Sequence, residues 1–324
     1  MAVNLTVIGL HQIGASIGMA LESHKDAIRR TGLDSEPARA QDLLKQKAFD
    51  RIAYNLHEAV ADAQVIVLAL PADKVGETLK EIAEDLQEGA VVVDTSPNRQ
   101  QTIELAREIL PLERFFVSMT PVINPAYLDV PRKDALEPHA DLFQQGAMVI
   151  TSGPEIHTDA LKLASDLANL LGSHPYFSEP VEADSVDSSI SLLPKLVAAA
   201  LVNTTTSQPG WRDSERLAGM AYLKTTFAAE LLDEEKELGQ TALINSEHTA
   251  RLLNEMIANL QEISQAIEAR DGEALQALLE EAKKHREEWL EHRLQANWDA
   301  YPQASTLSAQ DLPGIFGLRR GKKK

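Results

Sequence analysis

The first half of the chain alternates short apolar runs rich in β-branched residues with longer amphipathic stretches. This alternation predicts a parallel sheet whose strands are joined by crossover helices. The expected strands are Val3–Gly9, Ala27–Asp34, Val65–Leu70, Ala90–Asp94, Arg114–Val117, Met148–Thr151 and Pro175–Ser178. The expected helices are Gly14–Ser23, Glu36–Lys47, Ala72–Leu86, Gln100–Ile109 and Thr158–Leu171. A long loop rich in Pro and Asp is expected from Ser118 to Pro138.

After residue 178 the strand pattern stops and apolar residues recur at helical spacing. Ser188–Thr206 is predicted to be an apolar helix that Pro194 kinks, because proline lacks the backbone donor. The pattern from Leu252 to Ile267 resumes after a break at Asp271, which predicts a helical hairpin. Its apolar stripe exceeds what one hairpin can cover, so we expect this half to form a homodimer.

Composition narrows the classes of protein that fit this pattern. The 324 residues suggest two domains at roughly 150 residues each. Thirty-one basic and 49 acidic side chains leave a net charge of −18, which disfavours nucleic acid and anionic membranes as partners. There is no cysteine, the histidines show no ligand spacing, and no metal site is expected. The start lacks a signal-peptide pattern and no apolar run approaches a membrane span, so a cytoplasmic protein is expected.

The first strand runs into a glycine turn that leads to a helix, with Gly9, His11, Gln12, Ile13 and Gly14 in sequence. Such a turn lets the first amides of the helix face a pyrophosphate. It is an altered GxGxxG pattern because His11 stands at the middle glycine, where its side chain either crowds the pyrophosphate or hydrogen-bonds to it. The alternative is a tight strand-to-helix turn without a ligand.

Asp34 lies at the end of the second strand, 34 − 9 = 25 residues after Gly9. A carboxylate there accepts hydrogen bonds from the adenosine ribose, although a helix-capping role is the alternative. Glu36 would repel a 2′-phosphate and favours NAD, while Arg39 leaves NADP open.

Two further residues complete the expected cofactor site. Leu70 and Pro71 end the strand that begins at Val65, so they are expected to contact the nucleotide as well. The fold class that follows is an α/β Rossmann-type doubly wound sheet with a second, all-helical domain. The expected boundaries are 1–178 for the dinucleotide-binding domain, 179–300 for the helical substrate and dimerisation domain, and 301–324 for a C-terminal extension with a basic tail.

Several segments of the first half resemble one enzyme family. They are Val7–Leu10, Gly14–Ser16, Gly32–Asp34, Glu58–Ala63, Leu68–Pro71 and Val92–Asp94. In this order they resemble the prephenate and arogenate dehydrogenases. That resemblance implies a Rossmann half, a helical half that forms the dimer, and an NAD(P)-dependent oxidative decarboxylation of prephenate or arogenate in tyrosine biosynthesis.

Two motifs of the second half extend the resemblance. Ser191–Lys195 is similar to the family's Ser-His-Leu-Pro-His helix, and Trp211–Ala218 is similar to its arginine segment, which meets the substrate carboxylates. The resemblance implies that Arg212 and Arg216 bind substrate. They are four residues apart, so a helix would place both on one face, where two guanidiniums can grip carboxylates. Local ion pairs with neighbouring carboxylates are the alternative.

The chain departs from the family at its catalytic histidine. The family's Gly-His-Pro segment corresponds here to Met119-Thr120-Pro121, so Thr120 stands in the place of the histidine. A threonine does not titrate near neutral pH and cannot accept the hydroxyl proton. Leu192 and Lys195 replace the two histidines of the helical motif as well. These losses disfavour prephenate oxidation by the family's usual mechanism.

Three residues are the expected replacements at the catalytic centre. Lys195 follows Pro194 on the helix that lines the cleft in this architecture, although a lysine extending from an apolar helix to solvent is the alternative. Ser96 and Thr120 could hydrogen-bond the reacting oxygen, or serve only as turn and strand-end hydroxyls. His139, in the long loop, could swing into the cleft, although a surface position is the simpler interpretation.

The sequence leaves two functions open. The first is an NAD(P)-dependent oxidoreductase that acts on prephenate, arogenate or another small carboxylated alcohol. The second is a dinucleotide-binding or regulatory homologue without catalytic activity that has lost its base. What distinguishes them is whether a titrating side chain faces the nicotinamide.

Overall fold

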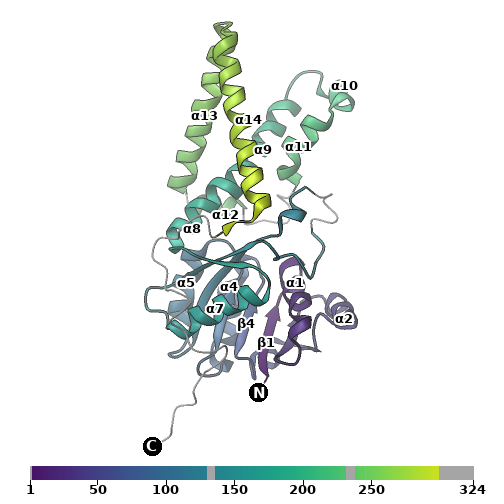
Figure 1. Ribbon diagram of the computed structural model, residues 1–324, viewed down its shortest axis with the longest axis vertical. Coiled ribbons are helices and arrows are strands. Elements are labelled where there is room, and N and C mark those ends of the chain that lie inside the picture. The colour runs from purple at the N-terminus through teal and green to yellow at the C-terminus, as the bar shows by residue number, and fades with distance from the viewer. Residues whose placement is uncertain (1, 130–135, 231–237, 245, 299–324) are drawn as a thin grey trace, which may run out of the picture. The chain divides into compact units, whose positions relative to one another are not determined.

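The computed structural model describes residues 2–129, 136–230, 238–244 and 246–298. The chain divides into two compact units (Figure 1). Unit 1 comprises Met1–Ala183 together with Leu290–Lys324, and unit 2 comprises Asp184–Trp289. The basic tail expected at 301–324 lies outside the described residues.

Unit 1 is built on one sheet of eight strands in the order β3-β2-β1-β4-β5-β6-β7-β8. The strands are β1 Val3–Ile8, β2 Ile28–Leu33, β3 Arg51–Ile52, β4 Val65–Leu68, β5 Val91–Asp94, β6 Phe115–Val122, β7 Ala147–Ser152 and β8 His174–Phe177. Every neighbouring pair is parallel except β6 and β7, so β7 and β8 both run opposite to the other six strands and the expectation of a wholly parallel sheet is wrong for these two. The strand order reverses direction at β1 and β4, which confirms the doubly wound fold.

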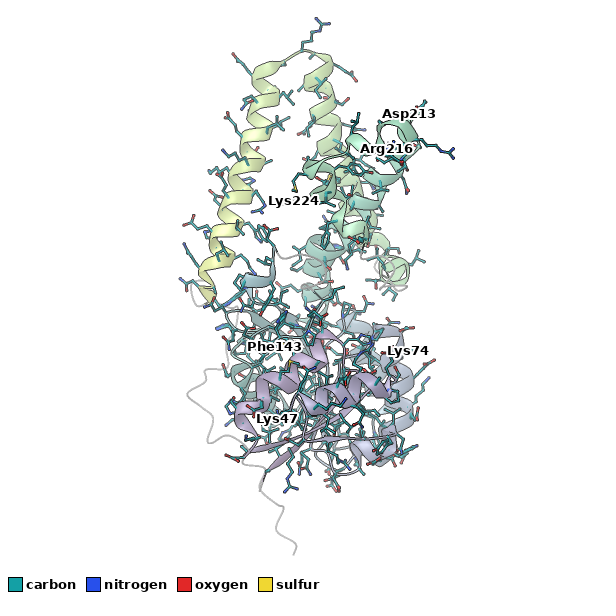
Figure 2. The ribbon with its side chains drawn as sticks, turned by 90° about the vertical axis from the view of Figure 1, so that its right-hand side faces the viewer. Lys47, Lys74, Phe143, Asp213, Arg216 and Lys224 are labelled. Carbon is teal, nitrogen blue, oxygen red and sulfur yellow. The ribbon has the colours of Figure 1, made fainter. Side chains whose placement is uncertain are left out.

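Helices cover both faces of this sheet. They are α1 Gln12–Ala20, α2 Pro37–Lys45, α3 Leu56–Val60, α4 Ala72–Ile82, α5 Arg99–Ile109 and α7 Thr158–Leu170. One apolar core joins the sheet to α1, α2 and α7, and includes the buried Phe143 (Figure 2). The other core joins the opposite face to α3, α4 and α5. Strands buried on both faces read as unbroken apolar runs, which is why β4 and β5 were predictable.

The strand β6 is longer than its sequence suggests. A loop was expected from Ser118, but β6 continues to Val122 and pairs with β7 along its length. Pro121 resembles a loop residue, because proline cannot donate to the hydrogen bonds of a sheet. The antiparallel partner β7 overrides that local preference, so the expected start of the loop is corrected to residue 123.

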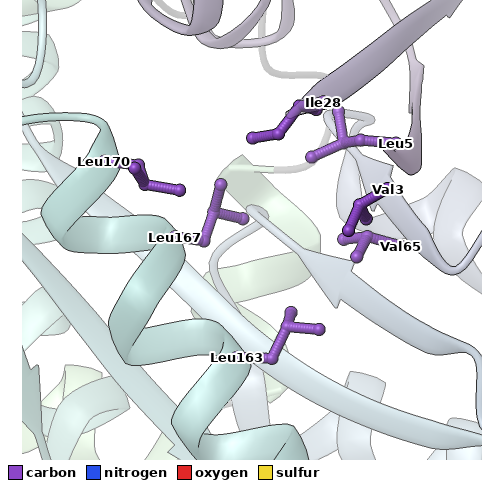
Figure 3. Close-up of a pocket in the computed structure, with 7 residues that line it drawn as sticks. All are labelled: Val3, Leu5, Ile28, Val65, Leu163, Leu167 and Leu170. Atoms are coloured by element: carbon purple, nitrogen blue, oxygen red, sulfur yellow. The ribbon is translucent and has the colours of Figure 1, made fainter. Parts of the chain in front are cut away.

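A small apolar pocket lies between the sheet and α7 (Figure 3). It is lined by Val3, Leu5, Ile28, Val65, Leu163, Leu167 and Leu170. Four of these residues lie at or near the amino ends of β1, β2 and β4. The pocket is therefore at the edge of the sheet opposite the glycine turn, and its lining offers no group that could bind or react.

The described residues of unit 2 are helical and contain no strand, in agreement with the expected all-helical domain. The helices of this half are α8 Pro180–Asp187, α9 Leu193–Thr206, α10 Trp211–Ser214, α11 Met220–Glu230, α12 Leu238–Ile244, α13 Ser246–Glu268 and α14 Gly272–Gln295, of which α8 begins and α14 ends in unit 1. The antiparallel pair α13 and α14 is the expected hairpin (Figure 1). Helix α11 packs against α9.

Pro194 lies at the beginning of α9 rather than inside an α-helix. The preceding Ser188–Leu192 form a π-helical turn, so the irregularity expected at Pro194 appears just before it. Proline leaves one carbonyl of the previous turn without its helical donor, and a π turn is a common way to accommodate such a break.

Large apolar side chains remain exposed along the hairpin. Leu260 and Ile267 on α13 are each 56% exposed, and Trp289 on α14 is 51% exposed. Among the described residues, Pro180–Thr206 is long and apolar enough to cross a membrane by length and composition. This is weak evidence for a span, because a helix that packs against protein passes the same test.

The end of α14 returns to unit 1. Arg293 donates from Nη2 to the carbonyl of Ile123, just after β6. The Trp298 indole donates to the carbonyl of Gln145 at 3.3 Å. These contacts attach Arg293 and Trp298 to unit 1.

Candidate functional site

The glycine turn lies at the carboxyl ends of the neighbouring strands β1 and β4, between which the strand order reverses, and open α/β sheets bind ligands at this position. Gly9 has a left-handed φ of +89°, and a Cβ atom there would lie 2.3 Å from the carbonyl oxygen of Ala69. A Cβ atom on Gly14 would lie 1.9 Å from the carbonyl oxygen of Gly9. Only glycine fits at either position, so the turn presses tightly against the end of β4.

Helix α1 begins directly after this turn. His11 is its N-cap residue and makes no side-chain capping bond, and the first turn contains no carboxylate. The amides of Gln12, Ile13 and Gly14 have no acceptor within the helix, because they precede its first hydrogen-bonded amide. The ladder begins when the amide of Ala15 donates to the carbonyl of His11 at 2.9 Å. The turn therefore fits an anionic group such as a pyrophosphate.

Asp34 is placed at the same edge, directly after β2. Its carboxylate is 2% exposed and accepts from the amide of Leu10 at 2.7 Å and from the amide of Glu36 at 2.8 Å. Arg39 donates from Nη1 to both oxygens of Asp34 at 3.1 and 3.3 Å, and from Nη2 to Glu36 at 2.8 Å. One guanidinium is thus shared between two carboxylates beside the turn.

His11 contacts this cluster through its ring. Nη1 of Arg39 lies 2.9 Å from Nε2 of His11. Arginine can only donate, so this ring nitrogen of His11 accepts and carries no proton. The sequence left open which way His11 points, and the structure turns it toward Asp34 and Arg39. Arg39 had been noted only as an argument for NADP, and nothing in the sequence indicated its contact with His11.

The remaining expected cofactor residues lie around the same turn. A Cδ atom of Leu70 would be 3.0 Å from a Cβ atom on Gly9, and Pro71 is the N-cap residue of α4. Ile13 packs against the core on the α1 face. The side-chain amide of Gln12 donates from Nε2 to the carbonyl of Glu137 at 3.3 Å. All eight expected cofactor residues are therefore gathered at one edge of unit 1.

Ser96 and Thr120 meet at the ends of β5 and β6. Thr120 Oγ1 donates to the carbonyl of Ser96 at 3.3 Å. Ser96 is 3% exposed and donates from its hydroxyl to Asp94 at 2.8 Å and from its amide to the other oxygen at 3.0 Å. Burial raises the pKa of Asp94 to about 6, against the lowering effect of its hydrogen bonds and of Arg99. The structure thus brings the two expected hydroxyls together.

Sequence reasoning missed the role of Asp94 in this loop. A carboxylate at the end of an otherwise apolar buried strand was the available signal. Asn98 is a second unusual feature of this loop, because it adopts the left-handed conformation with φ of 63° at the N-cap of α5. Strained positions of this kind are frequent at functional sites.

Lys195, Arg212 and Arg216 lie on unit 2. Lys195 is half-buried near the start of α9, while both arginines are exposed on α10 and the 3-10 turn after it. Figure 2 shows Arg216 with its side chain directed away from the ribbon. Among the described residues, neither arginine forms an ion pair with Asp213 or Glu215, so that alternative is not supported.

The two arginines are remote from Lys195 within one chain. The Trp211 ring packs on the Tyr222 ring at 5.6 Å between centroids, and the Tyr222 hydroxyl lies 2.9 Å from the Thr205 hydroxyl. These contacts hold α10 at the carboxyl end of α9. Lys195 is near the opposite end, separated by about 16 Å of helix at 1.5 Å per residue. One chain therefore does not bring Lys195 and the arginines to a common point.

Two family descriptions match consecutive parts of the chain. Residues 17–176 match "Prephenate dehydrogenase, nucleotide-binding domain", and residues 179–281 match "Prephenate dehydrogenase, dimerization domain". Together the matches cover well over half of the chain. The first begins after the glycine turn, so the assignment of that turn depends on its geometry.

Individual relatives agree with these matches. The prephenate dehydrogenase of Bacillus subtilis is 26% identical over 288 residues, which covers 87% of this chain and 75% of the relative. The cyclohexadienyl dehydrogenase of Zymomonas mobilis is 25% identical over 293 residues, with 87% and 94% covered.

Solved structures show the same fold. The prephenate dehydrogenase of Aquifex aeolicus in complex with hydroxyphenyl propionate and NAD+ has a TM-score of 0.76 at 20% identity, with 89% of this chain and 98% of that chain covered. The arogenate dehydrogenase of Synechocystis has a TM-score of 0.70 at 20% identity, with 89% and 100% covered. Both the Rossmann half and the helical half are included in these alignments.

Proposed function

Because the chain belongs to the prephenate dehydrogenase family, we propose that it is an NAD-dependent enzyme that oxidises and decarboxylates prephenate or arogenate. The observation that carries the proposal is the glycine turn, with the buried carboxylate of Asp34 bonded to the amide of Leu10. Relatives named prephenate and cyclohexadienyl dehydrogenase support the reaction class.

The residues at the turn fit a dinucleotide. The first amides of α1 would hold the pyrophosphate, and Asp34 would accept from the adenosine ribose. The two negative charges of Asp34 and Glu36 exceed the single positive charge of Arg39. This balance favours NAD over the more anionic NADP. When bound, NAD+ supplies the hydride acceptor of the reaction. NADP stays open because Arg39 lies beside the ribose carboxylate.

The substrate would be bound mainly through its negative charge. Arg212 and Arg216 have no described carboxylate partner and are the proposed ligands of the substrate carboxylates. Lys195 is the proposed substrate contact on α9. Ser96 and Thr120 are proposed to hydrogen-bond the oxygen that is oxidised. The match to the dimerization domain and the exposed apolar side chains of α13 support a homodimer.

Binding and turnover test these assignments in order. Calorimetry with NAD and NADP comes first, followed by NADH formation from prephenate and from arogenate. Arg216→Ala should raise the KM for the substrate much more than the KM for NAD. Lys195→Met should lower turnover and leave NAD affinity nearly intact, whereas Lys224→Met, at an exposed lysine on α11, should change neither.

A second function is favoured by Thr120, which stands where the family's catalytic histidine is expected. A homologue that kept the fold but lost its base would bind NAD without oxidising substrate. Binding of NAD together with no NADH formation from either substrate would support this alternative over the enzyme.

A further inference from the structure

Oxidation of a carbinol requires a group that accepts the hydroxyl proton, and Thr120 does not supply one. A histidine at the same crevice could do so, since an imidazole accepts protons near neutral pH. The segment between β6 and β7 carries such a histidine, His139.

The ends of this segment are tied together. The amide of Asn124 donates to the carbonyl of Leu142 at 2.6 Å. The Asn124 side chain donates to the carbonyl of Asp141 at 3.1 Å. His139 is therefore three residues before Leu142, whose backbone is hydrogen-bonded to that of Asn124 just beyond the end of β6.

The same segment is fastened to α1. The amide of His139 donates to the hydroxyl of Ser16 at 3.0 Å, and Ser16 is fully buried. The carbonyl of Glu137 accepts from Gln12, in the first turn of α1. Residues 137–139 thus run along the first turns of the helix whose N-terminus begins at the glycine turn.

These two attachments place His139 relative to the sheet. Strands β4 and β5 lie between β1 and β6, and all four end at the same edge. Residues 137–142 are bonded both to the first turns of α1 and to Asn124 just after β6, so they lie near the edge at which β4 and β5 end. That edge also carries Ser96 and Thr120, the proposed contacts of the reacting oxygen. His139 is consequently on the wall of the nucleotide crevice and not on a remote surface.

The ring of His139 is held in one orientation. It stacks on the ring of Tyr127, with 4.4 Å between centroids and 21° between planes. The Tyr127 hydroxyl donates to Asp141 at 2.6 Å. Burial and this carboxylate raise the pKa of Tyr127 to about 12, so it remains a neutral donor. Stacking occupies the face of the imidazole, and both of its nitrogens lie in the edge of the ring.

Several titratable and polar groups of the described residues lie beside His139. Asp141 and Glu137 lie on its own segment, and Asp141 is engaged by Tyr127. On α1 the contacting residues Gln12 and Ser16 do not titrate. The other imidazole at the crevice, His11, is directed to Arg39 and accepts from it.

We propose that His139 is the catalytic residue that accepts the hydroxyl proton of the substrate, with Tyr127 as its positioning residue. This inference rests on the proposed function. The O–H proton passes to a ring nitrogen of His139 while the carbinol C–H bond breaks and its electron pair leaves as hydride to NAD+. The new carbonyl draws the electron pair of the C–CO2 bond into the ring, CO2 leaves, and His139 returns its proton to the ring oxygen.

Lys195 is less suited to this step. A protonated amine must first lose its proton, and nearby positive charges promote that loss. Arg212 and Arg216 do not supply such charges, because they lie beyond the far end of α9. Lys195 is therefore assigned to substrate contact and not to proton acceptance.

The test compares two substitutions of the same kind. His139→Gln should lower kcat for prephenate or arogenate about 100- to 10,000-fold, the usual cost of losing a positioned base, and leave the Kd for NAD within about twofold. The control is His24→Gln, at a histidine of unit 1 near the amino end of β2, which should alter neither value. Free imidazole should restore part of the activity of His139→Ala, since it replaces the missing proton acceptor.

The outcomes separate the two proposals. Full activity of His139→Gln, or a loss of activity in His139→Ala that imidazole does not restore, overturns the assignment of the base and leaves the enzyme intact. A wild-type protein that binds no NAD, or that forms no NADH with either substrate, overturns the proposed function and with it this inference. Circular dichroism of each variant should match the wild type, because His139 donates to Ser16 through its backbone.

Discussion

The carboxylate of Asp34 accepts a hydrogen bond from the backbone amide of Leu10 at 2.7 Å. This bond ties the end of β2 to the turn that follows β1. The acidic side chain expected to hold the ribose therefore also shapes the phosphate turn, and its two effects should be separable by substitution.

Asp34→Ala should weaken NAD binding about 10- to 100-fold, because a charge-assisted hydrogen bond contributes about 1.5–3 kcal/mol. It should also lower the free energy of unfolding, since the Leu10 amide loses its acceptor. Asp34→Asn keeps an acceptor oxygen for the Leu10 amide. It should therefore unfold with nearly the free energy of the wild type while still binding NAD more weakly. Calorimetry and urea unfolding measure the two effects. An Asp34→Ala protein with unchanged NAD affinity would remove the ribose role.

Glu36→Gln should shift the preference between cofactors toward NADP. The substitution frees one side of Arg39, which then faces a 2′-phosphate without competition from Glu36. Glu36 is 66% exposed, so the expected change is modest, about fivefold or ~1 kcal/mol. The ratio of the two dissociation constants at low salt measures it. Asp42→Asn, at an exposed carboxylate of α2 paired with Lys45, is the control and should leave the ratio unchanged.

Asp94 should make stability depend on pH. Its carboxyl ionises near 3.8 when unfolded and near 6 when buried, so the folded state binds more protons between these values. Stability therefore falls as pH rises through this window, by ~3 kcal/mol, and is level above it. Urea unfolding from pH 4 to pH 8 should show this slope, and Asp94→Asn should flatten it.

A partly buried carboxylate provides the comparison for Asp94. Burial also raises the pKa of Asp166, but this residue is more exposed. Asp166→Asn should consequently alter the slope less than Asp94→Asn. Equal slopes in the wild type and in Asp94→Asn would show that another group titrates in this range.

Tyr127→Phe should reduce kcat about three- to tenfold with little change in NAD affinity. The variant keeps the ring on which His139 stacks but loses the hydroxyl that anchors it to Asp141. Net loss of one hydrogen bond is worth about 1 kcal/mol, which sets the size of the effect. Steady-state kinetics measure kcat, and calorimetry measures the affinity for NAD. A variant with wild-type kcat would mean that Asp141 does not help to position His139.

Leu260→Glu should convert the protein from dimer to monomer. Leu260 is 56% exposed on α13, and a charge in an apolar interface weakens association by ~2 kcal/mol or more, about 30-fold. Light scattering at low micromolar concentration detects the halved mass. Glu262→Gln, an exposed neighbour on α13, should remain dimeric. A wild-type monomer at high concentration would contradict the proposed homodimer.

Elements that are buried on both sides were readable from sequence. Val65–Leu68 and Val91–Asp94 appear as unbroken apolar runs, and their surroundings force them to be strands. Arg51–Ile52 and Leu56–Val60 were not placed, because two to five residues carry no measurable period. The end of β6 was missed since Thr120 and Pro121 owe their conformation to a partner strand far along the chain.

The site divides in the same way. Gly9, Gly14 and Asp34 follow from local spacing, because a turn and a strand end set their positions. The contact between Arg39 and His11 spans 28 residues, and that between His139 and Ser16 spans 123. Such contacts depend on how separate segments pack, and a sequence pattern contains no record of them. His139 was therefore interpreted as a surface residue.

The return of α14 to unit 1 makes the nucleotide-binding part a split unit. Its polypeptide leaves at Ala183 and comes back at Leu290, where Arg293 and Trp298 bond to backbone carbonyls of Ile123 and Gln145. A fragment that stops near residue 178 would leave those carbonyls without their donors. Ile123 borders the segment that carries His139. Removing the C-terminal residues should therefore loosen the wall of the nucleotide crevice, which is built from the N-terminal part of the chain.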